Sequence, residues 1–121
     1  MEEFKKLGLT DNSIQALEKK GFIKPTAVQT QVIPLLLEGK KDIVAQSQTG
    51  TGKTAGFALP ILETIQERSA SVQAIILTPT RELAIQVAKE IHSLKGDKDI
   101  KVLAVYGGDA IGPQIEKLKR G

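Results

Sequence analysis

The stretch SQTGTGKT at residues 47–54 decides the fold of this chain. A short apolar run, IVA at residues 43–45, comes just before it, and an apolar pattern typical of a helix follows over residues 53–67. Gly50 and Gly52 allow the backbone to turn sharply and to approach a phosphate closely. Because a helix N-terminus also attracts anions, the pattern predicts a phosphate-binding loop between a strand and a helix.

Each residue type in this loop has an expected task. Lys53 should reach the β- and γ-phosphate oxygens of a nucleotide, and the Thr54 hydroxyl should bind Mg²⁺, so these two are the candidate catalytic residues. The strict loop pattern has Gly where this chain has Ser47. The alternative interpretation is a flexible Gly-Thr turn with an exposed lysine. The backbone that should cradle the phosphates comprises Ser47, Gln48, Thr49, Gly50, Thr51 and Gly52.

A helical region is predicted before the loop. Thr10, followed by acidic and polar residues, is expected to cap a first helix that ends at Gly21. Pro25 is expected to open a second helix that ends at Gly39.

Strands and helices are predicted to alternate in the rest of the chain, which gives an α/β fold with right-handed crossovers. The nearly continuous apolar character of the strands is typical of a parallel sheet covered on both faces. We expect strands at residues 42–46, 73–77 and 101–106. We expect helices at residues 53–67, 80–94 and 110–120, the first kinked or divided by Pro60. The chain is accordingly divided into a helical region, 1–40, and a partial phosphate-loop domain, 41–121.

Composition limits the class of protein. The 121 residues allow one domain, and 17 Lys and Arg against 14 Asp and Glu give a net charge of +3, too small for binding by bulk electrostatics. With no Cys and one His, a thiolate or zinc cluster is excluded. No apolar run approaches the roughly 20 residues of a membrane span. No signal peptide is recognisable, so we expect a cytoplasmic protein without a membrane partner.

Four segments, in order and spacing, resemble the motifs of DEAD-box ATP-dependent RNA helicases. GFIKPTAVQ at residues 21–29 is similar to the Q motif, with Phe4 as its upstream aromatic, and the phosphate loop matches motif I. PTRELA at residues 79–84 matches motif Ia, and YGG at residues 106–108 matches the GG segment. The resemblance covers nearly the whole chain. It implies a P-loop NTPase of RecA-like fold, a three-layer sandwich around a parallel sheet, here incomplete with about three strands.

The resemblance also implies an adenine site in the Q motif, formed by Phe22, Lys24, Thr26 and Gln29. The Gln29 amide can both donate to and accept from the adenine edge, which favours ATP over GTP. Phe22 would stack on the adenine, Thr26 would fix the Q-motif loop, and Phe4 would pack beneath it. Taken alone, Gln29 would be interpreted as a solvated helix residue and Phe22 as a core aromatic.

An RNA site is implied at two further motifs. Pro79, Thr80 and Arg81 lie where a strand passes into a helix, so N–H groups, a hydroxyl and a guanidinium converge in a way that suits an RNA phosphate. Gly107 and Gly108 would let backbone amides approach the sugar-phosphate chain, consistent with sequence-independent binding. Without the resemblance, these residues would be an ordinary helix cap and an ordinary turn.

The chain departs from the family at its C-terminal end. The DEAD sequence, the TPGR and SAT segments and the second RecA-like domain do not occur before Gly121. The expected strands should therefore leave open edges and unburied apolar faces. They could be covered by the missing helicase parts, or by repacking, self-association or domain swapping, which we favour.

The implied function is the ATP-binding and RNA-contacting segment of a helicase that couples ATP binding and hydrolysis to duplex unwinding. The isolated chain should have negligible ATPase activity, because the expected carboxylates are lacking. The alternative is a minimal or engineered P-loop module that binds nucleotides without catalysis. A small-molecule kinase would leave PTRELA unexplained.

Overall fold

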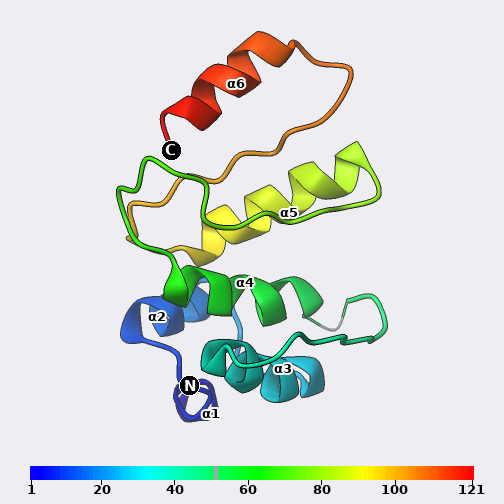
Figure 1. The fold of residues 1–121 in the computed structure, drawn as a ribbon. Coiled ribbons are helices and arrows are strands. Elements are labelled where there is room, and N and C mark those ends of the chain that lie inside the picture. Colours follow the sequence, from blue (N-terminus) through cyan, green and yellow to red (C-terminus); the bar gives the residue numbers. More distant parts are fainter. Residues whose placement is uncertain (51) are drawn as a thin grey trace.

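Helices make up the regular structure of the described part of the chain. The computed structural model describes residues 1–50 and 52–121. Within these residues the helices are α1 Glu2–Lys5, α2 Asp11–Lys19, α3 Ala27–Glu38, α4 Lys53–Thr64, α5 Arg81–Leu94 and α6 Ile111–Lys119 (Figure 1). The short α1 was not predicted from the sequence, whereas the other five lie where helices were expected.

One aliphatic core joins helices α1 to α5. α3 packs along α4, and α4 packs in turn against α5. The fully buried side chains come from α1 to α5 and include Phe4, Leu17, Ile33, Leu59, Leu62 and Leu94. α6 buries no residue and lies apart from the other helices in Figure 1. The core is therefore built from Leu, Ile, Val and Ala with a single fully buried aromatic ring.

A capping box sets the start of α3. The Thr26 hydroxyl accepts from the Gln29 backbone N–H at 3.4 Å, and Gln29 Oε1 accepts from the Thr26 N–H at 2.9 Å. These bonds provide acceptors for backbone N–H groups at the start of the helix, so the helix begins at Ala27. Pro25 therefore precedes the cap instead of opening the helix. The predicted end is confirmed, since Gly39 adopts a left-handed φ of 70° at the C-cap.

The helix after the phosphate loop runs through its proline. α4 is continuous from Lys53 to Thr64 with Pro60 inside, so of the predicted kink or division the division is wrong, and the helix ends earlier than residue 67. Helix α5 follows the prediction closely. The Thr80 hydroxyl accepts from the Leu83 backbone N–H at 3.1 Å, the expected cap.

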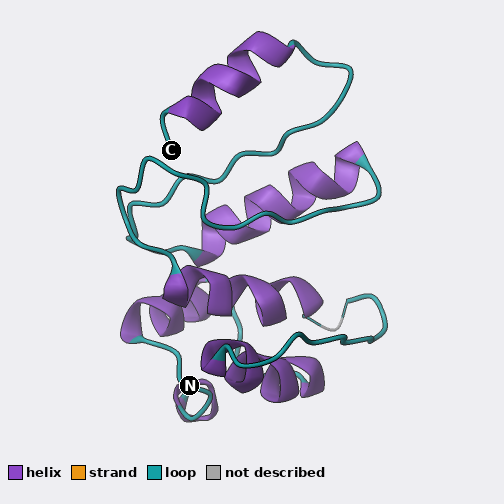
Figure 2. Cartoon of the chain, in the orientation of Figure 1, coloured by secondary structure: helices purple, strands orange, loops and turns teal. Residues whose placement is uncertain are grey.

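The predicted strands do not form within the described residues. Segments 42–46, 73–77 and 101–106 are loops in Figure 2. A strand requires a neighbour that takes up its backbone N–H and C=O groups. Among the described residues, no backbone hydrogen bond joins one of these segments to another. The parallel sheet expected from the sequence is thus not observed, because the segments lack adjacent strands with which to pair.

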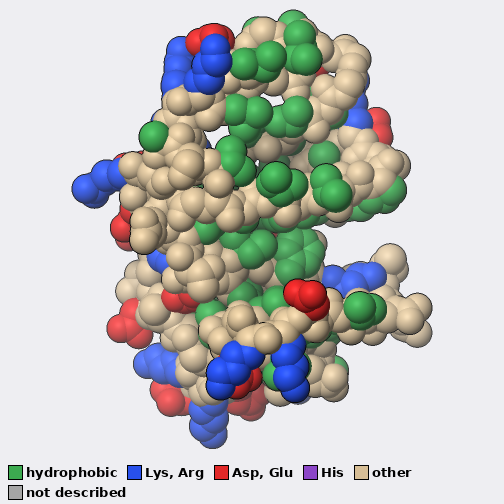
Figure 3. Space-filling view, viewed as in Figure 1, with side chains coloured by type: hydrophobic (Ala, Val, Ile, Leu, Met, Phe, Trp, Pro, Cys, Tyr) green, Lys and Arg blue, Asp and Glu red, His purple; other side chains and the backbone are tan. Residues whose placement is uncertain are grey.

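Several apolar side chains of these segments are consequently exposed, as expected for open edges, whereas Ile76 and Val102 are partly buried against the core. Val44 is 100% exposed, Leu77 90% and Ile75 77%. Hydrophobic side chains gather across the upper half of the face seen in Figure 3. These three residues lie in strand-like sequences, and among the described residues nothing covers their side chains. None of the described helices has the length and apolar character that crossing a bilayer requires.

A carboxylate from α4 holds the N-terminus of α2. Glu63 Oε1 accepts from Ser13 Oγ at 2.6 Å and from both the backbone N–H and the hydroxyl of Thr10 at 3.0 Å. Thr10 is the N-cap residue of α2, but its side chain makes no capping bond to its own helix. The predicted Thr10 cap is therefore replaced by a tertiary one, in which a negative charge faces the positive end of α2.

Replacing this carboxylate should destabilise the chain. We expect Glu63→Gln to lower the free energy of unfolding by about 1–2 kcal/mol, because charge-assisted hydrogen bonds and a helix-dipole interaction are weakened together. Urea unfolding followed by circular dichroism measures the change. Glu18→Gln, an exposed position on α2, is the matched control and should alter stability by less than about 0.5 kcal/mol. Equal effects of the two substitutions would contradict the tertiary cap.

Candidate nucleotide and RNA site

The phosphate loop ends in a helix that begins at a glycine. α4 has Gly52 as its N-cap, with a φ of 81° and no side-chain capping bond. The first N–H groups of this helix therefore face a position that no capping side chain fills, which suits an anion. Lys53 Nζ donates to the Ser47 carbonyl at 2.8 Å, so the lysine bridges the two ends of the loop. Its exposed side chain can exchange this carbonyl for a phosphate oxygen.

Gly52 is also where the Q motif meets the phosphate loop. Gln29 Nε2 donates to the Gly52 carbonyl at 3.2 Å. A Cβ at position 52 would lie 2.3 Å from Gln29 Nε2, so both the positive φ and the space require glycine. The interpretation of Gln29 as a solvated helix residue is wrong, because its side chain is fully buried. Its adenine contact stays a prediction, with both amide atoms engaged inside the chain.

The aromatic pair of the Q motif lies as expected. Phe4 is fully buried and meets Phe22 edge to face, with ring centroids 6.4 Å apart and planes at 80°. Phe4 thus packs beneath the Q-motif loop, as predicted, and Phe22 is half-buried against the core. Stacking of Phe22 on adenine stays a prediction.

The other residues predicted to bind a nucleotide differ in how far they are exposed to solvent. Thr54, in the first turn of α4, and Thr26 at the α3 cap are half-buried. Thr51 lies outside the described residues. Ser47 is half-buried, and the exposed members are Lys24, Gln48, Thr49 and Gly50.

The predicted RNA residues are brought together at the N-terminus of α5. Thr80 caps the helix, and the Thr78 hydroxyl donates to the Thr80 carbonyl at 3.1 Å, which shapes the turn. The Arg81 guanidinium carbon lies 5.0 Å from the centroid of the Tyr106 ring. A Cβ built on Gly108 would be 3.8 Å from Arg81 Nη1. The PTRELA and GG segments therefore share one surface, which includes the exposed Pro79 and Gly107.

Residues outside the predicted set complete this arrangement. Gln114 of α6 receives the Tyr106 N–H on Oε1 at 3.1 Å and donates from Nε2 to the Tyr106 carbonyl at 3.2 Å. Tyr106 opens the YGG segment, but neither Tyr106 nor Gln114 was assigned a role from the sequence. An aromatic residue directly before two glycines, with an amide on the next helix, was the available signal.

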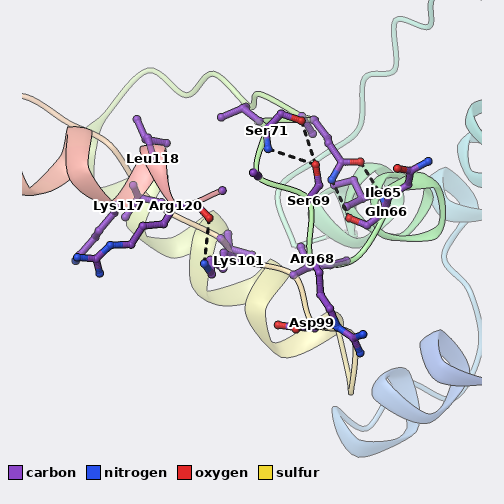
Figure 4. A pocket seen from close by; sticks show the side chains of 18 residues that line it. Ile65, Gln66, Arg68, Ser69, Ser71, Asp99, Lys101, Lys117, Leu118 and Arg120 are labelled. Carbon is purple, nitrogen blue, oxygen red and sulfur yellow. Dashed lines mark hydrogen bonds and ion pairs between the residues drawn. The ribbon is translucent and has the colours of Figure 1, made fainter.

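A hollow on the surface lies away from these residues. It measures about 550 Å³ and is lined by segments 65–74 and 99–103 together with the end of α6 (Figure 4). Two polar contacts lie at its edges. Arg68 Nε pairs with Asp99 Oδ2 at 3.3 Å, and Lys101 Nζ donates to the Arg120 carbonyl at 3.3 Å. The hollow contains none of the predicted nucleotide or RNA residues, and it separates two segments predicted as strands.

The chemistry of the loop fits a polyphosphate better than a dedicated metal site. Among the described residues, no group of three or more His, Cys, Asp or Glu could hold a metal ion. Mg²⁺ is commonly bound through few protein ligands, nucleotide phosphates and water. Thr54 would supply one such ligand, so the residues present fit Mg²⁺ carried on a bound nucleotide.

A glycine-rich loop that opens α4 and is joined through Gln29 to residues 21–29 is an arrangement typical of P-loop proteins. A sequence model of the DEAD/DEAH box helicase family matches residues 26–121. The chain belongs to the DEAD/DEAH box helicase family.

Relatives are similar over almost all of this chain. A probable ATP-dependent RNA helicase of Methanocaldococcus jannaschii is 57% identical over 116 residues, which are 96% of this chain and 31% of that protein. The crystal structure of a DEAD box protein from the hyperthermophile Methanococcus jannaschii superposes with a TM-score of 0.92 at 55% identity, covering 98% of this chain and 32% of the other. Saccharomyces cerevisiae Dbp5, solved with RNA and ADP BeF3, gives a TM-score of 0.77 at 31% identity, covering 98% and 35%. The structural neighbours contain RecA-like helicase domains, and this chain spans about a third of the full length of the three proteins named here.

Proposed function

We propose that this chain is the ATP-binding and RNA-contacting part of a helicase that couples ATP binding and hydrolysis to the unwinding of RNA duplexes. The observation that carries the proposal is the hydrogen bond from Gln29 Nε2 to the Gly52 carbonyl. It brings the residue expected to select adenine against the loop expected to hold the phosphates. One nucleotide can thus engage both motifs.

ATP would be held at two ends. At the phosphate end, Lys53 exchanges the Ser47 carbonyl for β- and γ-phosphate oxygens, while the α4 N-terminus faces the same charges. Thr54 contributes a hydroxyl to Mg²⁺, which neutralises phosphate charge when bound. At the adenine end, the Phe22 ring stacks on the base beside Lys24 and Thr26. The Gln29 amide, which is bonded to Thr26 and Gly52 in the structure, exchanges these partners for the base edge. The other loop residues cradle the phosphates through their backbone.

RNA would bind through its backbone at the surface shared by PTRELA and GG. Arg81 and the capped α5 N-terminus face phosphates, and the small Gly107 and Gly108 allow close approach. The likeness to yeast Dbp5, a protein solved with RNA, supports this assignment.

Catalysis would require further parts of a helicase. We expect the 121-residue chain to bind ATP without turning it over, since its described residues contain no group of three or more His, Cys, Asp or Glu that could hold the metal ion for hydrolysis. Segments 42–46, 73–77 and 101–106 become strands of a parallel RecA-like sheet when neighbouring strands are present. In the isolated chain, self-association or domain swapping covers their apolar side chains. The proposed setting is the cytoplasm.

Titration with ATP and GTP in the presence of Mg²⁺ tests the proposal. We expect the chain to bind ATP about tenfold more tightly than GTP. This factor corresponds to the cost of leaving one buried donor-acceptor pair without partners when guanine is bound. Gln29→Ala should remove this preference, with circular dichroism verifying that the variant folds. Phe22→Leu, which keeps apolar volume, should weaken both nucleotides equally.

Two results would contradict the proposal. Equal binding of ATP, GTP and inorganic triphosphate by the unchanged chain would instead indicate a P-loop module without a base site. RNA-stimulated ATP turnover that Lys53→Ala abolishes would show that the chain itself is catalytically complete.

A further inference from the structure

We propose that Tyr106 is a positioning residue for RNA binding, which holds the Arg81 guanidinium flat so that its N–H edge meets an RNA phosphate. This inference rests on the proposed RNA contact of Arg81 and adds a residue to it. The observation behind it is the 5.0 Å separation between the Arg81 guanidinium carbon and the Tyr106 ring centroid.

The Tyr106 ring contacts the face of the Arg81 guanidinium and leaves the guanidinium N–H donors available for hydrogen bonds. An arginine stacked on an aromatic ring keeps its planar fork of N–H donors directed outward, in the geometry that fits a phosphate. Among the described residues, no carboxylate lies within ion-pair distance of Arg81. The stacked ring is therefore the contact that orders this exposed, long side chain before RNA arrives.

Tyr106 is itself held firmly, although it lies in a loop. Gln114 pairs with both the N–H and the carbonyl of Tyr106, at 3.1 and 3.2 Å, as a neighbouring strand would. Gln114 Nε2 also donates to the Ala110 carbonyl at 3.2 Å. This side chain connects α6 to the tyrosine, so the ring position is set by a hydrogen-bonded pair instead of a sheet.

The position of Gly108 explains why the contact between Tyr106 and Arg81 matters for RNA binding. A Cβ on Gly108 would lie 3.8 Å from Arg81 Nη1, so the guanidinium stands over the glycine turn. A phosphate bound by Arg81 therefore lies near the backbone of the GG segment. Tyr106 couples the two RNA motifs, since it precedes the glycines and contacts the arginine.

A double-mutant cycle on RNA affinity tests the inference in the 121-residue chain. The probe is a fluorescent ten-nucleotide oligouridylate, titrated at several salt concentrations. We expect Arg81→Ala to weaken binding about tenfold and to reduce the salt slope by about 0.7. Tyr106→Leu should weaken binding about threefold with an unchanged salt slope, because the charge remains. Tyr106→Phe, which keeps the ring, should bind as the original chain does.

In the Arg81→Ala background, Tyr106→Leu should have no further effect. A threefold loss that persists there would mean that Tyr106 acts only on the fold, and would overturn the positioning role. So would an unchanged affinity for Tyr106→Leu alone when Arg81→Ala weakens binding. If instead Arg81→Ala binds RNA like the matched control Arg120→Ala, the proposed RNA site itself fails, and the inference fails with it.

A measurement without RNA checks the pairing directly. The Arg81 side-chain protons should show an upfield ring-current shift in NMR spectra, retained in Tyr106→Phe and lost in Tyr106→Leu. Identical Arg81 shifts in all three proteins would refute the stacking on which the inference depends.

Discussion

Lys53→Ala should weaken ATP binding about 30-fold, with little change in the stability of the chain. A charge-assisted hydrogen bond contributes roughly 2 kcal/mol, which corresponds to that factor. In the structure the exposed Lys53 ammonium contacts only the Ser47 carbonyl among the hydrogen bonds described, so its removal disturbs no core packing. Calorimetric titration with ATP and Mg²⁺ measures the loss, and urea unfolding measures stability.

The matched control for charge is Lys41→Ala. Lys41 is exposed and directly precedes segment 42–46, outside the phosphate loop. It removes the same charge without touching the loop, and we expect less than a twofold change in ATP affinity. If Lys53→Ala binds ATP as tightly as Lys41→Ala does, the phosphate loop is not the nucleotide site.

Leu59→Ala should lower the free energy of unfolding by about 3 kcal/mol. Leu59 is fully buried in α4 within the common core, and truncation of such a side chain removes apolar contacts and leaves a cavity. Leu77→Ala is the same chemical change at a 90% exposed site and should cost less than about 0.5 kcal/mol. Urea unfolding at low protein concentration compares the two.

This pair also tests the state of the segments predicted as strands. Should Leu77→Ala cost as much as Leu59→Ala, Leu77 is covered in solution, contrary to the structure. A cost that rises with protein concentration would identify a second copy as the cover, the self-association favoured by the sequence. Sedimentation at the same concentrations gives the assembly state.

Helix limits were largely predictable because their signals are local. Thr80 caps a helix through a hydrogen bond to a residue three positions later, and Gly39 ends a helix through its own φ. Such signals act within one turn and can be recognised without knowing the rest of the fold. At the start of α3 the proline signal was misleading, because the cap residue is Thr26. The Thr10 cap failed for a tertiary reason, since its hydroxyl donates to Glu63, which is 53 residues away.

The sequence by itself determined the motifs, their order and hence the family, as well as the placement of α2 to α6. Only the tertiary structure decided that Gln29 is buried against Gly52, that Arg81 stacks on Tyr106, and that segments 42–46, 73–77 and 101–106 remain unpaired. The physical reason is the distance along the sequence over which each interaction acts. A helix satisfies its backbone within its own residues, whereas a strand and a side-chain contact between distant motifs depend on what the fold brings beside them.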